Sequence, residues 1–204
     1  MKLYEFDGFP SPRRVRVFLA EKGIDGVESV QVDVPGGEAR QEPFRSKNPL
    51  GEVPVLELDD GTCISETTAI SRYFEELQPE PALFGTSATE KALVEMWQRR
   101  LESGLMGAVL TYFHHATAGL GPLETYQNRD WGEKNRERAV ATMHLLDKQL
   151  EGRTFVTGDT YSIADVTGLC AIDFANYCKI DVPAELANLR AWYKRVSSRP
   201  SASA

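Results

Sequence analysis

The chain has 204 residues, of which 42% are hydrophobic, and a formal net charge of −7. This length suits two small domains, and the apolar fraction is large enough to bury a core in each. The acidic balance provides no global positive field to hold nucleic acid or an anionic membrane surface, so we expect neither as a partner. Charged residues interrupt the first twenty positions, which argues against a signal peptide or membrane span and predicts a cytoplasmic protein.

Three cysteines, Cys63, Cys170 and Cys178, lack the CxxC or histidine spacing of a metal site. An odd, unpaired set also argues against a disulfide framework. We therefore expect no metal and interpret all three as core thiols.

The first third of the chain alternates strand and helix signals. Lys2–Phe6 is a short apolar run that predicts a strand, and Ser11 followed by Pro12 predicts a helix with Ser11 as its N-cap. That helix should end before Gly23, and the valine-rich residues 27–34 predict a second strand. The expected unit is βαβ.

A hairpin and another helix should follow. A polar, short helical stretch runs through Phe44, and residues 53–64 form two strand-like runs around an Asp-Asp-Gly turn. The polar residues 65–68 then precede an apolar stripe at helical spacing over residues 69–77.

Beyond this point the pattern is helical throughout. Residues 80–87 are polar and proline-bearing, which predicts a linker. Apolar residues at helical spacing predict one long helix over 93–112, another over 139–150 and a last one over 186–196. Residues 162–165, Ser-Ile-Ala-Asp, resemble a capping box that opens a buried helix.

Three motifs in this order resemble the cytosolic glutathione transferase superfamily over nearly the whole chain. They are Asn48-Pro-Leu-Gly-Glu-Val-Pro-Val-Leu56, Glu66-Thr-Thr-Ala-Ile70 and Gly158-Asp-Thr-Tyr-Ser-Ile-Ala-Asp-Val166. The resemblance implies an α/β plus all-α fold: a thioredoxin-like βαβ-α-ββ-α domain over 1–79, a linker over 80–87 and an all-helical domain over 88–204.

The run Tyr112-Phe-His-His-Ala-Thr-Ala-Gly-Leu-Gly-Pro122, with Tyr126-Gln-Asn and Trp131-Gly, resembles more closely the fungal and bacterial group that lacks the usual catalytic Tyr, Ser or Cys. Membership implies conjugation of glutathione, the co-substrate, to a small hydrophobic electrophile. It also implies a homodimer.

The same resemblance assigns the glutathione-binding residues. Pro54 should follow a cis bond and leave the Val53 main chain free to pair with the cysteinyl backbone. Glu66 and Thr67 should bind the charged γ-glutamyl head at a helix N-terminus, where unpaired N–H groups attract a carboxylate. Plainer alternatives are a proline that begins an edge strand and a glutamate that complements the helix dipole.

Two cations precede the Val-Pro motif. Related enzymes place a cation in this segment, so Arg40 or Lys47 could pair with the glycine carboxylate of glutathione. Ordinary solvated charges are the alternative for both.

Thiol activation is where the sequence departs from the commoner classes. The usual catalytic residue falls near Tyr4 or Phe9, of which Phe9 cannot donate a hydrogen bond. Ser11 is a candidate to contact the thiol, and His114 matches the histidine thought to hold a catalytic water in the resembling group. Leu110 replaces the hydroxyl expected one turn before His114.

Other candidates surround these positions. Thr111 could reach His114 in place of the missing hydroxyl. Phe9, Tyr112 and Phe113 are candidates for the acceptor pocket between the domains, although aromatic residues are more often core. The alternative function is a non-catalytic glutathione-binding or protein-interaction module; a disulfide reductase would need a cysteine at the start of the first helix, where there is none.

Overall fold

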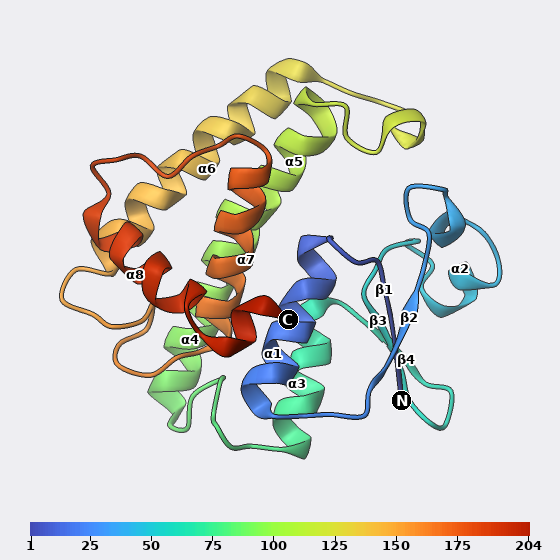
Figure 1. Cartoon of the computed structure of the whole chain (residues 1–204), viewed down its shortest axis with the longest axis horizontal. Helices are drawn as coiled ribbons and strands as arrows, with labels where there is room; N and C mark the ends of the chain where they lie inside the picture. The colour runs from blue at the N-terminus through green and yellow to red at the C-terminus, as the bar shows by residue number, and fades with distance from the viewer. The chain divides into compact units, whose positions relative to one another are not determined.

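A computed structural model describes all residues from 1 to 204 and divides them into two units, residues 1–81 and 82–203. The first unit is built on a four-stranded sheet in the order β2-β1-β3-β4 (Figure 1). β1 (Lys2–Glu5) is parallel to β2 (Glu28–Gln31) and antiparallel to β3 (Val55–Glu57), which pairs antiparallel with β4 (Cys63–Ser65). The predicted βαβ unit and hairpin are therefore both confirmed.

Helices cover the sheet of this unit. α1 (Pro10–Lys22) forms the crossover between the parallel strands and packs with α3 (Thr67–Leu77), whereas the short η1 (Glu38–Arg40) and α2 (Phe44–Lys47) lie on the other side of the sheet (Figure 1). α1 ends as predicted at Gly23, whose φ of 62° turns the chain so that the N–H of Ile24 reaches the carbonyl of Leu19 (2.9 Å).

The start of α1 differs from the prediction. Phe9 is the N-cap, in extended conformation, and the helix begins at Pro10. Pro10 suits the first helical position, because its missing N–H would have no helical partner there, and Phe9 before it is the boundary. Ser11 consequently lies inside the first turn and is not the N-cap.

A buried cation closes the far end of α1. The Lys22 ammonium pairs with Glu75 and donates to the carbonyls of Gln78 (2.8 Å), Pro79 (3.2 Å) and Pro81 (2.6 Å), and its side chain is 0% exposed. These carbonyls belong to the segment just after α3, so Lys22 supplies donors to backbone acceptors that lie outside the helix.

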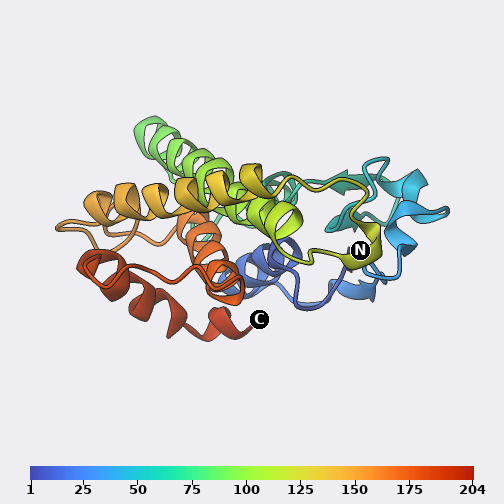
Figure 2. The ribbon, with the colours of Figure 1, turned by 90° about the horizontal axis from the view of Figure 1, so that it is seen from above.

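The second unit is entirely helical. Its helices are α4 (Ala88–Leu101), η2 (Glu102–Met106), α5 (Gly107–Ala116), η3 (Gly121–Leu123), α6 (Arg129–Gln149), α7 (Ile163–Tyr177), α8 (Ala187–Ser197) and η4 (Pro200–Ser203). α5 and α6 run side by side in Figures 1 and 2. Gly132 makes this close approach possible, because an added Cβ would lie 2.6 Å from the Cβ of Ala116.

The long helix predicted over 93–112 is interrupted. Glu102–Met106 form a π-helical turn between α4 and α5, and the carbonyl of Gly104 accepts a hydrogen bond from the Thr142 hydroxyl of α6 (2.9 Å). A π turn holds one residue more than an α-helical turn, which a pattern of apolar spacing over so few residues does not reveal.

Asp165 organises the buried part of the second unit. One of its oxygens accepts from the Ser162 N–H and hydroxyl (both 3.0 Å), which bears out the predicted cap of α7. The other accepts from the Val156 N–H (2.9 Å) and the Trp192 indole (2.8 Å) of α8. Burial raises the pKa of this carboxyl to about 6, against the hydrogen bonds that lower it.

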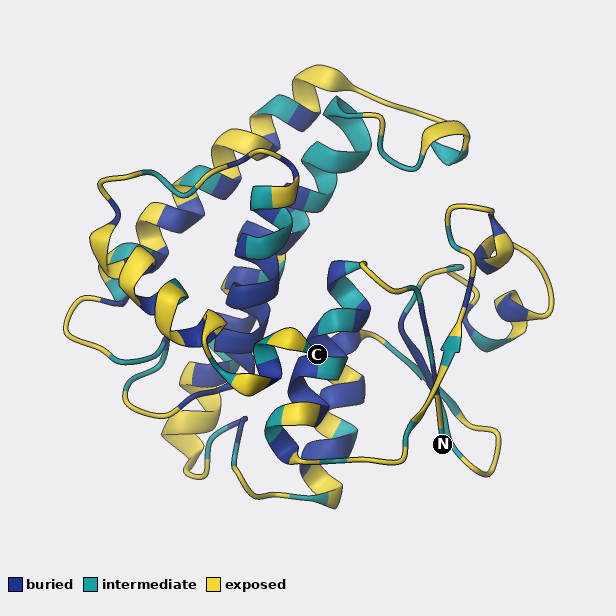
Figure 3. Ribbon diagram, viewed as in Figure 1, coloured by how far each residue is buried: buried dark blue, intermediate teal, exposed yellow.

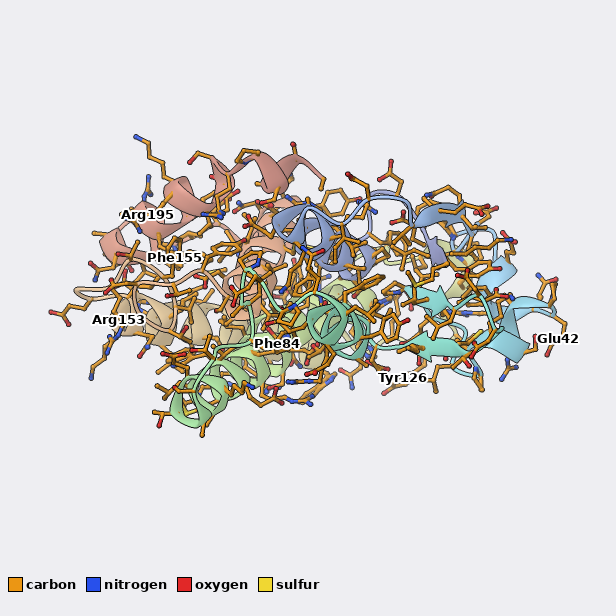
Figure 4. All side chains as sticks on the ribbon, turned by 90° about the horizontal axis from the view of Figure 1, so that it is seen from below. Glu42, Phe84, Tyr126, Arg153, Phe155 and Arg195 are labelled. Carbon is orange, nitrogen blue, oxygen red and sulfur yellow. The ribbon has the colours of Figure 1, made fainter.

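The loop between α6 and α7 is fastened to α8 as well. Arg195 of α8 donates to the carbonyl of Thr154 (2.8 Å), and Figure 4 shows its side chain beside those of Arg153 and Phe155. Leu83 and Phe84, which the sequence placed in the linker, are buried, and the carbonyl of Leu83 accepts from Ile163 (2.9 Å).

The predicted fold class, a thioredoxin-like domain followed by an all-helical domain, is confirmed. None of the helices is long and apolar enough to cross a membrane. Cys170 and Cys178 are buried as expected, and burial raises the pKa of Cys178 to about 11, whereas Cys63 is only partly buried.

Candidate glutathione site and histidine cluster

The N-terminus of α3 has an unusual backbone. Its N-cap, Glu66, has φ 71° and ψ 118°, is exposed, and makes no side-chain capping bond. No acidic residue occupies the first turn of α3. An anion placed at this helix end would be favoured by its first N–H groups and by the helix dipole.

Thr67, the first residue of α3, is buried at 3% exposure. Its hydroxyl accepts from the Arg14 guanidinium (3.0 Å) and lies 3.4 Å from the carbonyl of Ser11. Its side chain thus links the starts of α1 and α3, and the part of Thr67 available to a ligand is its backbone.

Arg14 is the residue that the sequence reasoning missed here. The residue is 5% exposed, and its guanidinium also lies 3.5 Å from the Ser11 hydroxyl. A usable signal was present, because Arg14 falls on the same helical face as Val17 and Phe18, which are fully buried. The charges among the first twenty residues were used only as an argument against a signal peptide, and not as evidence of a buried arginine.

The Val53–Pro54 peptide bond is cis, as the family resemblance implied. Val53 lies outside the β1–β3 ladder, which starts at Val55 and pairs that residue with Tyr4. Its N–H and carbonyl therefore lie just before β3 and take no part in the ladder.

The two predicted cations differ in their surroundings. Lys47 pairs with Glu57 (2.6 Å), and the same carboxylate oxygen accepts from the Tyr4 hydroxyl (2.7 Å). The Lys47 hydrogen bond lowers the pKa of Glu57, and the bond to Glu57 raises the pKa of both Lys47 and Tyr4. Arg40 is exposed at the end of η1.

In the second unit, the predicted histidine has a carboxylate partner. Nδ1 of His114 lies 2.7 Å from Oε1 of Glu124, and their side chains are 38% and 11% exposed. The proposed contact between Thr111 and His114 is not formed, because the Thr111 hydroxyl donates to the carbonyl of Gly107 (2.8 Å). Back-bonding of this kind is the usual alternative for a threonine inside a helix.

Residues 117–128, between α5 and α6, fold around this histidine. Gln127 donates to the carbonyls of His114 (2.7 Å) and Thr117 (2.8 Å), and His115 accepts from the Asn128 N–H (3.1 Å). Tyr126, labelled in Figure 4, places its ring 6.0 Å from that of His115. The predictions did not include Glu124, because no local pattern pairs it with a histidine ten residues earlier.

The predicted pocket aromatics are half-buried. Phe9 packs edge-on against Phe6 at 4.8 Å, and Phe113 packs edge-on against Phe174 at 5.5 Å. Tyr112 belongs to a stretch, residues 110–117, in which every residue is half-buried (Figure 3). Nowhere do three or more metal-binding side chains come together.

Comparison with known proteins identifies the family. Residues 3–82 match the description "Glutathione S-transferase, N-terminal domain", and residues 103–200 match "Glutathione S-transferase, C-terminal domain". The chain belongs to the glutathione S-transferase family. This membership confirms the resemblance that the sequence motifs indicated.

Individual relatives of this glutathione S-transferase span almost its full length. Glutathione S-transferase 2 of Saccharomyces cerevisiae is 45% identical over 98% of the chain and 87% of its own length. The crystal structure of Gtt2 from the same yeast has a TM-score of 0.97 at 45% identity, covering 100% of this chain and 99% of its own.

A bacterial structure is similar as well. A glutathione S-transferase domain-containing protein from Marinobacter aquaeolei VT8 has a TM-score of 0.96 at 51% identity, covering 98% of this chain and 99% of its own. Together these relatives confirm the closer likeness to a fungal and bacterial group.

Proposed function

We propose that this chain conjugates the thiolate of glutathione to small apolar electrophiles. Family membership supports transferase activity in general. The observation that carries the proposal for this chain is Glu66 at the start of α3, held at φ 71°. A strained, exposed residue at a helix N-terminus is a common feature of ligand sites.

The head of glutathione carries both charges that this end of α3 can recognise. The α-carboxylate suits the first N–H groups of the helix, and the α-ammonium suits the Glu66 carboxylate. The Thr67 hydroxyl is engaged with Arg14, so in this proposal Thr67 contributes its backbone N–H.

The rest of the tripeptide would bind along the edge of the sheet. The N–H and carbonyl of Val53, fixed by Pro54, pair with the cysteinyl backbone as a neighbouring strand does. Arg40 and Lys47 are the candidates for the glycine carboxylate. Lys47 also pairs with Glu57.

Activation of the thiol needs only modest help. A free thiol has a pKa of about 8.5, and lowering it to about 6.5 requires about 2.7 kcal/mol. One or two hydrogen bonds to the thiolate, worth about 1.5–3 kcal/mol each, are sufficient. His114 and Ser11 are the candidate donors or acceptors, and Phe9, Tyr112 and Phe113 are the proposed contacts of the electrophile.

Calorimetric titration with glutathione, followed by conjugation of chlorodinitrobenzene on the same sample, tests the proposal. We expect micromolar to millimolar binding with turnover, and a roughly tenfold or greater loss of affinity in Glu66→Gln. Glu76→Gln, an exposed site on the same helix, is the matched control and should bind as the wild type does.

Two other outcomes would contradict the proposal. Binding without turnover of any electrophile favours the non-catalytic glutathione-binding or interaction module. Absence of binding removes the glutathione site altogether.

A further inference from the structure

The two neighbouring histidines of α5 have opposite kinds of hydrogen-bond partner at the same ring nitrogen. Nδ1 of His114 faces a carboxylate oxygen of Glu124 at 2.7 Å. Nδ1 of His115 faces the backbone N–H of Asn128 at 3.1 Å. A neutral imidazole carries one N–H donor and one acceptor nitrogen, so each partner selects a tautomer.

For His115 the choice is fixed by the backbone. An amide N–H can only donate, so Nδ1 of His115 must offer its lone pair and the ring proton must reside on Nε2. For His114 the reverse holds. Oε1 of Glu124 also accepts from the Leu120 N–H (2.8 Å), and an ionised carboxylate can only accept, so the proton resides on Nδ1 of His114.

We propose that Glu124 is a positioning residue that holds His114 as its Nδ1–H tautomer and leaves Nε2 as a proton acceptor, while His115 is fixed in the opposite tautomer. This inference rests on the proposed function, in which His114 assists deprotonation of glutathione. The S–H bond breaks, the proton passes to Nε2 directly or through one water, and the electron pair remains on sulfur for attack on the electrophile.

Glu124 also stabilises the product of that step. Proton transfer turns His114 into an imidazolium, and the ionised carboxylate then faces a full positive charge across a charge-assisted hydrogen bond. The proton is later released to solvent, which restores the Nδ1–H tautomer. His115 cannot take this role through Nδ1, because its lone pair there is occupied by Asn128.

The loop over residues 117–128 holds the carboxylate in place. Gly119 has φ 53°, and a Cβ added to it would lie 2.3 Å from Oε1 of Glu124, so a larger residue there would displace the carboxylate from its present position. Gln127 fixes the end of α5 by donating to the carbonyl of His114 (2.7 Å). A catalytic group is effective when its partners are ordered before the substrate arrives.

Nuclear magnetic resonance of the full-length protein labelled with ¹⁵N-histidine tests the tautomers at neutral pH. We expect the Nδ1–H pattern for His114 and the Nε2–H pattern for His115, each assigned by its own His→Asn variant. His144, exposed on α6, serves as the unrestrained reference. An Nε2–H or doubly protonated His114 would overturn the proposal.

Kinetics test whether the tautomer matters for turnover. In Glu124→Gln we expect His114 to shift toward the mixed pattern of His144 and kcat to fall about tenfold or more, with the glutathione Kd within about twofold of the wild type. Glu137→Gln, an exposed site on α6, makes the same chemical change as a control and should keep the wild-type kcat.

Another variant separates positioning from folding. His114→Asn keeps an amide donor near the position of Nδ1 and so retains the contact with Glu124, but it lacks Nε2. We expect a folded protein that binds glutathione and has lost kcat to a similar extent. An altered tautomer in Glu124→Gln with unchanged kcat, or an active His114→Asn, would show that the pair is only structural.

The proposed function is judged separately, by calorimetry. If the wild type fails to bind glutathione, that function is wrong, whereas the tautomers of His114 and His115 are still decided by the spectra.

Discussion

At the scale of single residues, Glu66 and Lys179 share a positive φ, which residues other than glycine rarely adopt. Their φ angles are 71° and 62°. Such a conformation costs on the order of 1 kcal/mol and persists where the surrounding structure or a function requires it. Only Glu66 lies at the proposed ligand site.

Replacement by glycine should therefore separate strain from function. We expect Glu66→Gly to raise the free energy of unfolding by about 1 kcal/mol and to weaken glutathione binding by about tenfold or more. Lys179→Gly, the matched control, should gain similar stability and keep the affinity. Urea unfolding and calorimetry measure the two quantities, and unchanged affinity in Glu66→Gly would exclude its carboxylate from the site.

Lys22 supports a different prediction, about stability alone. Its ammonium pairs with Glu75 and satisfies three carbonyls after α3 while being fully buried. We expect Lys22→Met to lower the free energy of unfolding by about 3–5 kcal/mol, because one partner of a buried ion pair is removed. The measurement is urea unfolding.

The control is the double variant Lys22→Met, Glu75→Leu. The double variant removes the Glu75 carboxylate together with the Lys22 ammonium, so no unpaired charge remains buried. Its loss of unfolding free energy should therefore be smaller than that of the single variant. Equal losses in both variants would mean that the three carbonyls, and not the ion pair, account for the effect.

At the scale of elements, Asp165 joins the start of α7 to α8 through four donors on its two oxygens. Folding raises the pKa of this carboxyl from 3.8 to about 6, because burial outweighs those hydrogen bonds. The folded state therefore binds an extra proton between these values. The associated stability, about 3 kcal/mol, is complete below pH 4 and is lost as the pH rises through 6.

Asp165→Asn isolates this contribution. We expect the difference in unfolding free energy between wild type and variant to be larger near pH 4 than at neutral pH by about 3 kcal/mol. Denaturant unfolding across this range measures it. A difference that grows with pH would mean that the four donors stabilise the ionised carboxylate more than burial destabilises it.

Elements were predicted from the sequence where a local rule decides them. Gly23 ends α1 because a left-handed residue was required there, and Ser162 with Asp165 begins α7 as a capping box. The start of α1 was wrong because two candidate signals, Ser11-Pro12 and Phe9-Pro10, overlap and only one proline can take the first position. The π turn in 102–106 changes helical register without any residue type that marks it.

At the scale of the whole molecule, the family supports a homodimer as a proposal for this chain. If the folded state is dimeric, raising the protein concentration about a hundredfold should add about 2.7 kcal/mol to the apparent stability and raise the unfolding midpoint. Thermal unfolding over that range, with sedimentation as an independent measure of mass, tests this. A midpoint independent of concentration would indicate a monomer.

The candidate site could be predicted in part from the sequence, namely where its residues lie in short local motifs. Val53, Pro54 and Glu66 lie in short motifs, so their roles could be inferred from order along the chain alone. Arg14 contacts Thr67, which is 53 positions further along the chain, and Glu124 contacts His114, which is 10 positions earlier. Both contacts exist only after folding. Motifs thus indicated which ligand to expect, whereas the partners that orient the site needed the structure.

The π turn at Glu102–Met106 also determines which way the side chains of the following helix, α5, point about the helix axis. An α-helix advances about 100° per residue, and the π turn takes up one additional residue, so each side chain of α5 points about 100° away from where an uninterrupted α-helix of the same sequence would place it. Regularising this turn to α-helix without removing a residue would leave each side chain of α5 chemically intact yet aim His114 about 100° away from its present direction, whereas deleting one residue together with the turn would keep that direction. The direction in which this histidine points is thus encoded by a segment that contains none of the proposed site residues.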